Sequence, residues 1–119
     1  MANEFNNKRN EEGKALFSGS SIATLTAVTS DQNAVVAANS GLRLMGYSIK
    51  ESAAVPALST CNIIHGATVG GGVIAVNLKI ALSSSNTVWF GPDGIAVPNG
   101  ISVDWVAGQV DISIFYKVV

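Results

Sequence analysis

The sequence predicts an all-β protein: a jelly-roll-like antiparallel β-sandwich of about eight strands with an extended N-terminal arm. Three observations predict it. Apolar residues recur at every second position beyond residue 20, turn-forming sequences separate these runs, and this part of the chain shows no helical period. With 119 residues, the chain is long enough for one domain with its own core. We therefore divide it into an arm at 1–19 and a β-sandwich domain at 20–119.

The arm differs from the rest of the chain in composition. It holds six of the charged residues and has no sustained apolar period, so it has too little apolar surface to fold alone. We expect it to bind a partner through its apolar and cationic side chains. These are Phe5, Lys8, Arg9, Lys14, Leu16 and Phe17. The alternative is a short helix that folds back on its own domain.

The first strands are expected at 21–28 and 34–39, where the alternation is weak. The next strand, LRLMGYSIK, alternates on Leu42 and Leu44 and resumes on Tyr47 and Ile49. Because the phase slips at Met45 and Gly46, a β-bulge there would place the four apolar side chains on one face.

Further strands are expected at 58–65, 73–82, 86–90, 101–105 and 110–118. In the last of them Phe115 falls on the outward face. The strongest alternation puts the following residues on single faces of their strands: Ile74, Val76, Leu78, Ile80 and Leu82; Ile101, Val103 and Trp105; and Val110, Ile112, Ile114, Tyr116 and Val118.

The strands are separated by SDQN, NSG, HGATVGGG, GPDG, PNG and AGQ. In the sequence Gly-Pro-Asp-Gly at 91–94, proline sets φ, aspartate favours turns and glycine tolerates positive φ. PNG at 98–100 predicts a second turn, and AGQ at 107–109 is expected to close a tight hairpin. Trp89 and Trp105 fall where alternation places large apolar side chains, and we expect both to pack in the core.

The residue types offer little chemistry. His65 has no second histidine and no neighbouring acid, so it lacks the partners of a metal site or a catalytic dyad. Cys61 alternates with Ile63 and is expected to be a small core residue. GATVGGG at 66–72 lacks the Lys-Ser/Thr ending of a phosphate loop and precedes a strand. Asp93 and Asp104 supply too few oxygens for calcium. We expect no enzymatic activity, cofactor or metal.

Charged residues make up 13% of the chain, against about 25% in typical soluble domains. Residues 20–119 hold only nine of them, so we expect neighbouring protein to cover much of this surface. The net charge of −1 argues against nucleic acid as a partner. No apolar run is long enough for a membrane span, and the polar first residues do not form a secretory signal.

The segment VNL…WFGPDGIAVPNGISVDWVAGQVDISIFY resembles the C-terminal half of a group of small virion proteins of tailed bacteriophages. Upstream, RLMGYSIKES resembles a strand of the same group, so that the resemblance covers about residues 42–119. It implies an auxiliary capsid protein of the cement or decoration kind. The chain departs from the pattern at His65 and Ile64, and we expect Ile64 to make an outward apolar contact, as we do Phe115.

These expectations lead to a structural function. The protein would form a homo-oligomer, predicted to be a trimer, on the capsid exterior after assembly in the host cytoplasm. It would bind the major capsid protein and bridge neighbouring subunits. Two alternatives remain open: a carbohydrate- or receptor-binding module on the virion surface, and a small tail or neck component. Sugar binding would need exposed aromatic side chains.

Overall fold

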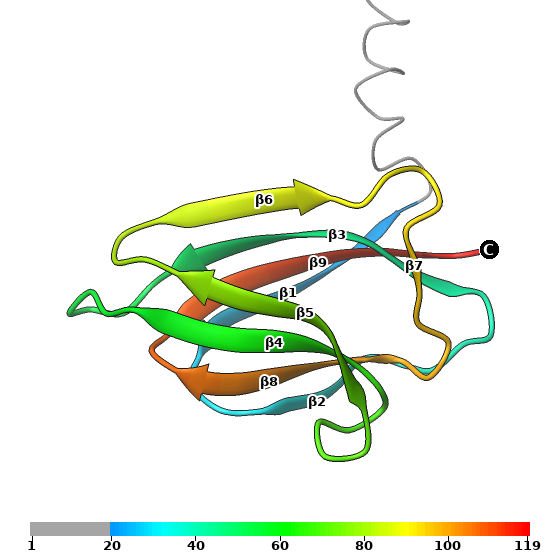
Figure 1. Ribbon diagram of the computed structural model, residues 1–119, viewed down its shortest axis with the longest axis horizontal. Helices are drawn as coiled ribbons and strands as arrows, with labels where there is room; N and C mark the ends of the chain where they lie inside the picture. Colours follow the sequence, from blue (N-terminus) through cyan, green and yellow to red (C-terminus); the bar gives the residue numbers. More distant parts are fainter. Residues whose placement is uncertain (1–19) are drawn as a thin grey trace, which may run out of the picture.

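The structure, a computed structural model, describes residues 20–119, which form two antiparallel β-sheets packed on one another (Figure 1). Within these residues there are nine strands. They are β1 (Ser21–Val28), β2 (Gln32–Val36), β3 (Leu42–Glu51), β4 (Ser59–His65), β5 (Val73–Ile80), β6 (Ser85–Trp89), β7 (Ile95–Ala96), β8 (Ile101–Ala107) and β9 (Val110–Val118).

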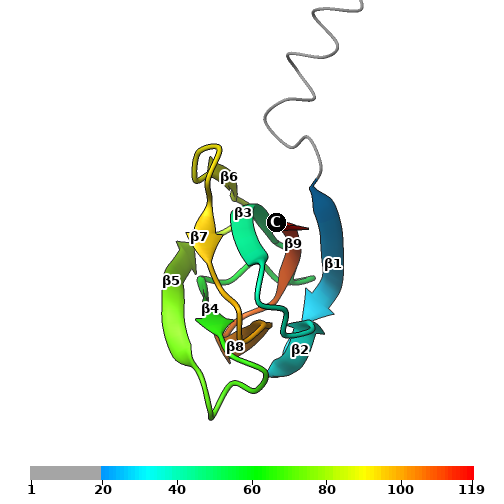
Figure 2. The ribbon, with the colours of Figure 1, turned by 90° about the vertical axis from the view of Figure 1, so that its right-hand side faces the viewer.

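The order of the strands defines the fold. The β1 sheet has the order β1–β9–β3–β6, with the short β7 beside β3, and the β2 sheet has the order β2–β8–β4–β5. The chain crosses between the sheets after β1, β2, β3, β5, β7 and β8. Figure 2 shows the two layers from the ends of the strands. This pattern of crossings is that of a jelly roll, and it confirms the predicted all-β sandwich.

The core lies between the two sheets and comes from alternate positions of their strands. Each fully buried aliphatic side chain contributes about 1.5–3 kcal/mol from removal of apolar surface from water. The β1 sheet supplies Val28, Leu42, Leu44, Tyr47, Ile49, Val110, Ile112 and Ile114, and the β2 sheet supplies Val36, Cys61, Ile63, Leu78, Ile80, Ile101 and Val103.

The predicted β-bulge in β3 is confirmed. The register of β3 against β9 shifts between Leu44 and Gly46, so Met45 is the extra residue. Because of this shift Leu44 and Tyr47 both face the core, although they are three residues apart. A regular strand would have turned one of them to the outer face.

The strand ends differ from prediction where a turn competes with the alternation. β2 covers 32–36 rather than 34–39, since the Asn39 amide donates to the Pro98 carbonyl oxygen (2.9 Å) outside the ladder. β5 ends at Ile80, which leaves Leu82 in a turn. β8 continues to Ala107 beyond the predicted 105.

Two of the three predicted turns near the C-terminus, GPDG and PNG, are confirmed. The predicted hairpin at AGQ is wrong, because β8 and β9 lie in different sheets and the chain crosses between the sheets there. The Gly94 amide donates to the Gly91 carbonyl oxygen (3.3 Å), and the Gly100 amide donates to that of Val97 (3.0 Å). Gly100 has φ 102° and Gly108 has φ 80°, a region that favours glycine. The glycine-rich sequence at 91–108 thus turns the chain.

Candidate functional site

Six of the eight residues predicted to contact a partner lie outside the residues that the structure describes. These are Phe5, Lys8, Arg9, Lys14, Leu16 and Phe17. The remaining two, Ile64 and Phe115, are on β4 and β9.

The expectation for Ile64 is wrong. Only 3% of Ile64 is exposed, although it lies outside the main core cluster. A Cβ built on Gly72 would collide with Ile64 Cγ2 and with the His65 carbonyl oxygen. The loop at 66–72 therefore folds over Ile64, and the absence of a side chain at Gly72 lets it come close. Ile64 holds this loop instead of facing a partner.

Phe115 lies half-buried on the outer side of β9, with Ile22 of β1 and Gly46 of β3 as its cross-strand neighbours. Trp89 of β6 pairs with Gly46 from the other side. Trp89 is half-buried and outside the core cluster, so the prediction that it packs in the core is wrong. One row across the outer side of the β1 sheet thus holds Ile22, Phe115, Gly46 and Trp89.

Trp105 behaves as predicted. It packs against the core from β8, and its Nε1 donates to the Gly108 carbonyl oxygen at 2.8 Å. The two tryptophans differ because Val88, not Trp89, takes the inward position on β6.

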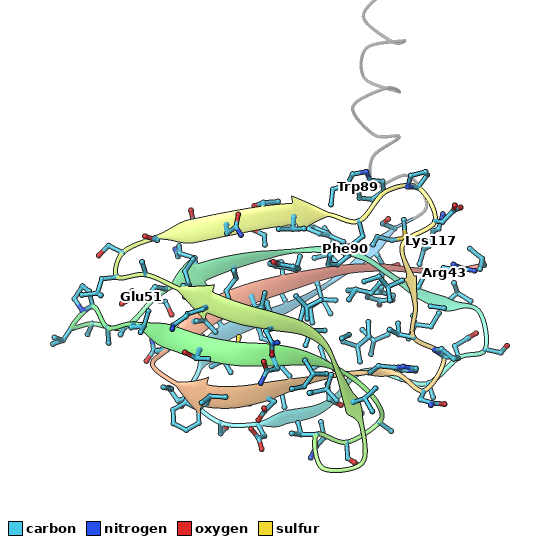
Figure 3. The ribbon with its side chains drawn as sticks, in the orientation of Figure 1. Arg43, Glu51, Trp89, Phe90 and Lys117 are labelled. Carbon is cyan, nitrogen blue, oxygen red and sulfur yellow. The ribbon has the colours of Figure 1, made fainter. Side chains whose placement is uncertain are left out.

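Two cations sit beside this row and hold the 91–94 turn. Arg43 and Lys117 are cross-strand neighbours on β3 and β9. Arg43 Nη1 donates to the Asp93 carbonyl oxygen (3.1 Å), and Lys117 Nζ donates to that of Pro92 (3.2 Å). Figure 3 shows both side chains at the end of the sandwich that carries this turn. Their observed contacts are structural.

The residues with the most reactive side-chain types are held in structural contacts. Cys61 is buried, as predicted, and its burial, with a smaller effect of the Asp104 charge, raises the pKa of its thiol to about 11. The thiol stays protonated at neutral pH, which is the unreactive form. His65 Nε2 accepts a hydrogen bond from the Asn99 amide at 3.1 Å. Within residues 20–119 no group of three or more His, Cys, Asp and Glu side chains could hold a metal ion.

Four exposed aliphatic side chains gather at one end of the sandwich, and we call them the apolar tip. Val55 and Leu58 lie in the 52–58 loop between β3 and β4, Leu82 in the 81–84 turn between β5 and β6, and Val106 near the end of β8. Val55 is 82% exposed and the other three are 49–56% exposed. In Figure 1 these segments form the left-hand end of the molecule.

Hydrogen bonds fasten the loops of the tip to one another. The Glu51 amide donates to the Ser84 carbonyl oxygen (3.0 Å), and the Ser52 amide donates to that of Gln109 (3.0 Å). Gln109 Nε2 returns a bond to the Ser52 carbonyl oxygen (3.0 Å). The segments that carry the four side chains are therefore cross-linked, although they are far apart in sequence.

Two buried side chains complete this network. Glu51 is 6% exposed, and it is the one charged residue that is buried among residues 20–119. Its Oε1 accepts the Ala57 amide at 2.7 Å (Figure 3). Ser59, fully buried, contacts the carbonyl oxygens of Ala57 and Gln109 through Oγ and accepts the Gln109 amide at 3.2 Å. A buried polar network of this kind fixes the backbone beneath the tip.

Charged residues surround the tip without entering it. Lys50 Nζ lies 3.9 Å from Asp111 Oδ2. Asp31 accepts the amide of Trp105, next to Val106, at 2.9 Å. Lys79 is exposed three residues before Leu82. Asp104, which is part-exposed, lies two positions before Val106 on the same face of β8. The rim therefore has two positive and three negative groups around an uncharged centre.

The sequence pattern missed the tip. The 52–58 loop reads SAAVPAL, with no charged residue, and this composition was the available signal. An apolar loop is unusual on a solvated surface. Covering one of the four side chains would contribute about 1–2 kcal/mol, because each keeps about half or more of the exposure that it has in the unfolded chain.

No helix within residues 20–119 has the length and the apolar character needed to span a membrane. Comparison of the chain with models of protein families, with curated proteins and with solved structures finds no match.

Proposed function

We propose that the protein is a structural component of a virion, without enzymatic activity, that self-associates and binds neighbouring subunits of the major capsid protein as a cement or decoration protein. A trimer on the capsid exterior is the form that we favour. The resemblance of residues 42–119 to small phage virion proteins supports this function. The observation that carries it is the composition of the sheet edges.

Edge strands offer unpaired backbone groups, and soluble monomers usually protect them with charged side chains, proline or bulges. The edges here are β1 and β6 of one sheet and β2 and β5 of the other. These four strands together hold one charged residue, Lys79, and no proline. β1 has no charged residue and its Ile22 is 60% exposed, although a register shift between Leu25 and Val28 interrupts its pairing with β9. Such edges suit a protein whose working state has protein neighbours.

The arm supplies the second part of the mechanism. One arm would make a small interface of modest affinity, but several arms on one oligomer bind as a unit. Their effective concentration raises the avidity by about 10²–10⁴-fold over a single arm. Capsid subunits bridged in this way separate only when several contacts break together, which stabilises the shell.

Binding to capsids tests the function. Heads stripped of the protein are incubated with the full chain or with a chain that lacks residues 1–19, and occupancy is measured. We expect the deletion to lower occupancy at least tenfold while the sheet spectrum in circular dichroism is kept. A variant with Lys8, Arg9 and Lys14 changed to alanine separates the cationic from the apolar contribution. Undiminished occupancy without the arm would refute its role.

A second candidate, carbohydrate binding, is supported by the position of Trp89. Trp89 and Phe115 flank Gly46 on the outer side of the β1 sheet, and aromatic side chains there are suited to stacking on sugar rings. Titration with neutral and acidic oligosaccharides, followed by tryptophan fluorescence, tests this candidate. A signal that persists in Trp89→Phe would come from Trp105 and would contradict a site at this row. A tail or neck component differs from the leading proposal mainly in symmetry.

A further inference from the structure

We infer that the apolar tip is the surface through which copies of this chain associate, with the tips of neighbouring copies packed together around a rotation axis. The inference rests on the self-association in the proposed function and names the residues that perform it. Its centre is Val55, Leu58, Leu82 and Val106.

The tip is prepared for binding because its backbone is already fixed. The 52–58 loop is tied by Glu51 Oε1 to the Ala57 amide (2.7 Å) and by Ser52 to Gln109 (3.0 Å). Exposed aliphatic side chains on a flexible loop would lose conformational freedom on association. On a fixed loop this loss is small, and the burial of apolar surface is realised in full.

The layout of the tip is that of an interface. Specific interfaces have an apolar centre without charged residues and a polar rim that stays accessible to water. Here the centre is uncharged, and the rim is formed by Lys50, Lys79, Asp31, Asp104 and Asp111. A protein that works as a monomer is expected to place some of its few charged side chains within such an apolar patch, because charge there keeps the surface soluble.

The mixed charge of the rim favours a second copy as the partner. In an oligomer with a rotation axis, the same surface of each copy lies at the interface. Rims that carried only one sign of charge would therefore repel each other. Two lysines and three aspartates allow each copy to present both signs to its neighbour. A rim that binds a different protein need not carry both signs of charge. It would instead carry charges opposite to those on that protein.

The size of the tip favours several copies over a single pair. Four partly exposed side chains cover less than the about 800 Å² per partner of a standard interface. In a cyclic arrangement each tip touches two neighbours, so that more of its surface is buried than in a pair.

The test uses the full chain. Native mass spectrometry and sedimentation equilibrium are applied to the wild type, Val55→Asp, Leu82→Asp and Val73→Asp. Val73, 66% exposed at the start of β5, is the matched control because it lies outside the tip. Circular dichroism and thermal melting confirm that each variant is folded. We expect the two tip variants to raise the dissociation constant of the oligomer at least a hundredfold, since the new carboxylates would meet at the axis. Val73→Asp should leave it unchanged.

Each outcome is decisive. If the wild type is oligomeric and either tip variant stays equally oligomeric, the inference is wrong, while the proposed function stands with another self-association surface. If Val73→Asp dissociates the oligomer as strongly as Val55→Asp does, the tip is not the specific surface and the inference is also wrong. A monomeric wild type over about 1–100 µM overturns both the inference and the self-association in the proposed function.

Discussion

The two ends of the sandwich close the same fold by different means. The end with the 66–72 loop and the 91–100 segment holds most of the described glycines, and its chain segments approach each other through the backbone. The Gly66 amide donates to the Gly100 carbonyl oxygen (3.0 Å), and a Cβ on Gly100 would lie 2.9 Å from the Val36 carbonyl oxygen. The tip has one glycine, Gly108, and is fastened by side chains such as Glu51 and Gln109.

The difference fits the proposal that the apolar tip contacts another protein. Glycine-rich turns satisfy their own backbone groups and present small surfaces to water. At the tip, buried polar side chains instead hold the loops that carry the exposed apolar side chains. Burying a charged residue such as Glu51 is costly unless its bonds are made, so a network of this kind indicates that the position of the loop matters. The comparison can be tested at both ends.

The largest effect is expected at the glycine end, from Gly100→Ala. Gly100 has φ 102°, and the added Cβ would press against the Val36 carbonyl oxygen. We expect a loss of about 3 kcal/mol in the free energy of unfolding, measured by denaturant titration. Gly70→Ala is the matched control, because a Cβ there meets nothing within 4 Å and Gly70 has no positive φ. Equal effects at both positions would show that close approach does not determine the structure of this end.

Cys61, on a strand between the two ends, makes the stability of the protein depend on pH. The pKa of the Cys61 thiol is raised from 9.0 to about 11 in the folded protein. Above pH 9 the unfolded chain therefore loses this proton while the folded chain keeps it, so stability falls as the pH rises from 9 to 11. The loss reaches about 2–3 kcal/mol at pH 11. Cys61→Ala should be less stable at pH 7 but should lose this part of the pH dependence. An identical slope in wild type and variant would contradict the assignment.

Glu51→Ala tests the tip. Removal of the carboxylate deprives the Ala57 amide of its acceptor, and we expect a loss of about 1–2 kcal/mol in stability. Hydrogen exchange should accelerate in the 52–58 loop and leave the 91–100 segment unchanged. Glu51→Gln keeps a side-chain carbonyl oxygen and should restore most of the protection. If exchange in the loop is the same in Glu51→Ala and wild type, the loop is fixed by other contacts and the contrast between the ends weakens.

The sequence predicts the strands and the glycine-rich end of the molecule better than it predicts the apolar tip. Alternation located all the longer strands, and the phase slip at Met45 revealed the bulge, because both are local consequences of two-residue periodicity. The turns at the glycine-rich end could also be predicted, because turn-forming residues act locally through their own φ angles. The two-residue β7 escaped notice because it is too short to show a period.

The surfaces were harder to predict because they depend on residues distant in sequence. Ile64 was expected to face outward, and only the return of the 66–72 loop buries it. Trp89 was expected inside, but β6 places Val88 there. The tip joins three connections that become neighbours only when the jelly roll closes. An apolar loop such as SAAVPAL is visible in the sequence, but its bonds to Ser84 and Gln109 are not.

The smallest effects concern the rim of the tip, where two variants of one ion pair should differ. Lys50 and Asp111 are 3.9 Å apart, and the Lys50 side chain is largely exposed. Because an exposed pair of this kind contributes little, Lys50→Ala should change stability by less than about 0.5 kcal/mol. Asp111 also accepts the Ala27 amide at 2.8 Å, and Ala27 has φ 53°. Asp111→Ala should therefore cost about 1 kcal/mol, measured by denaturant titration at low and high salt, with little dependence on salt. If the two variants cost the same and salt removes both effects, the ion pair rather than the backbone bond is what Asp111 contributes, and the rim is held by charge alone.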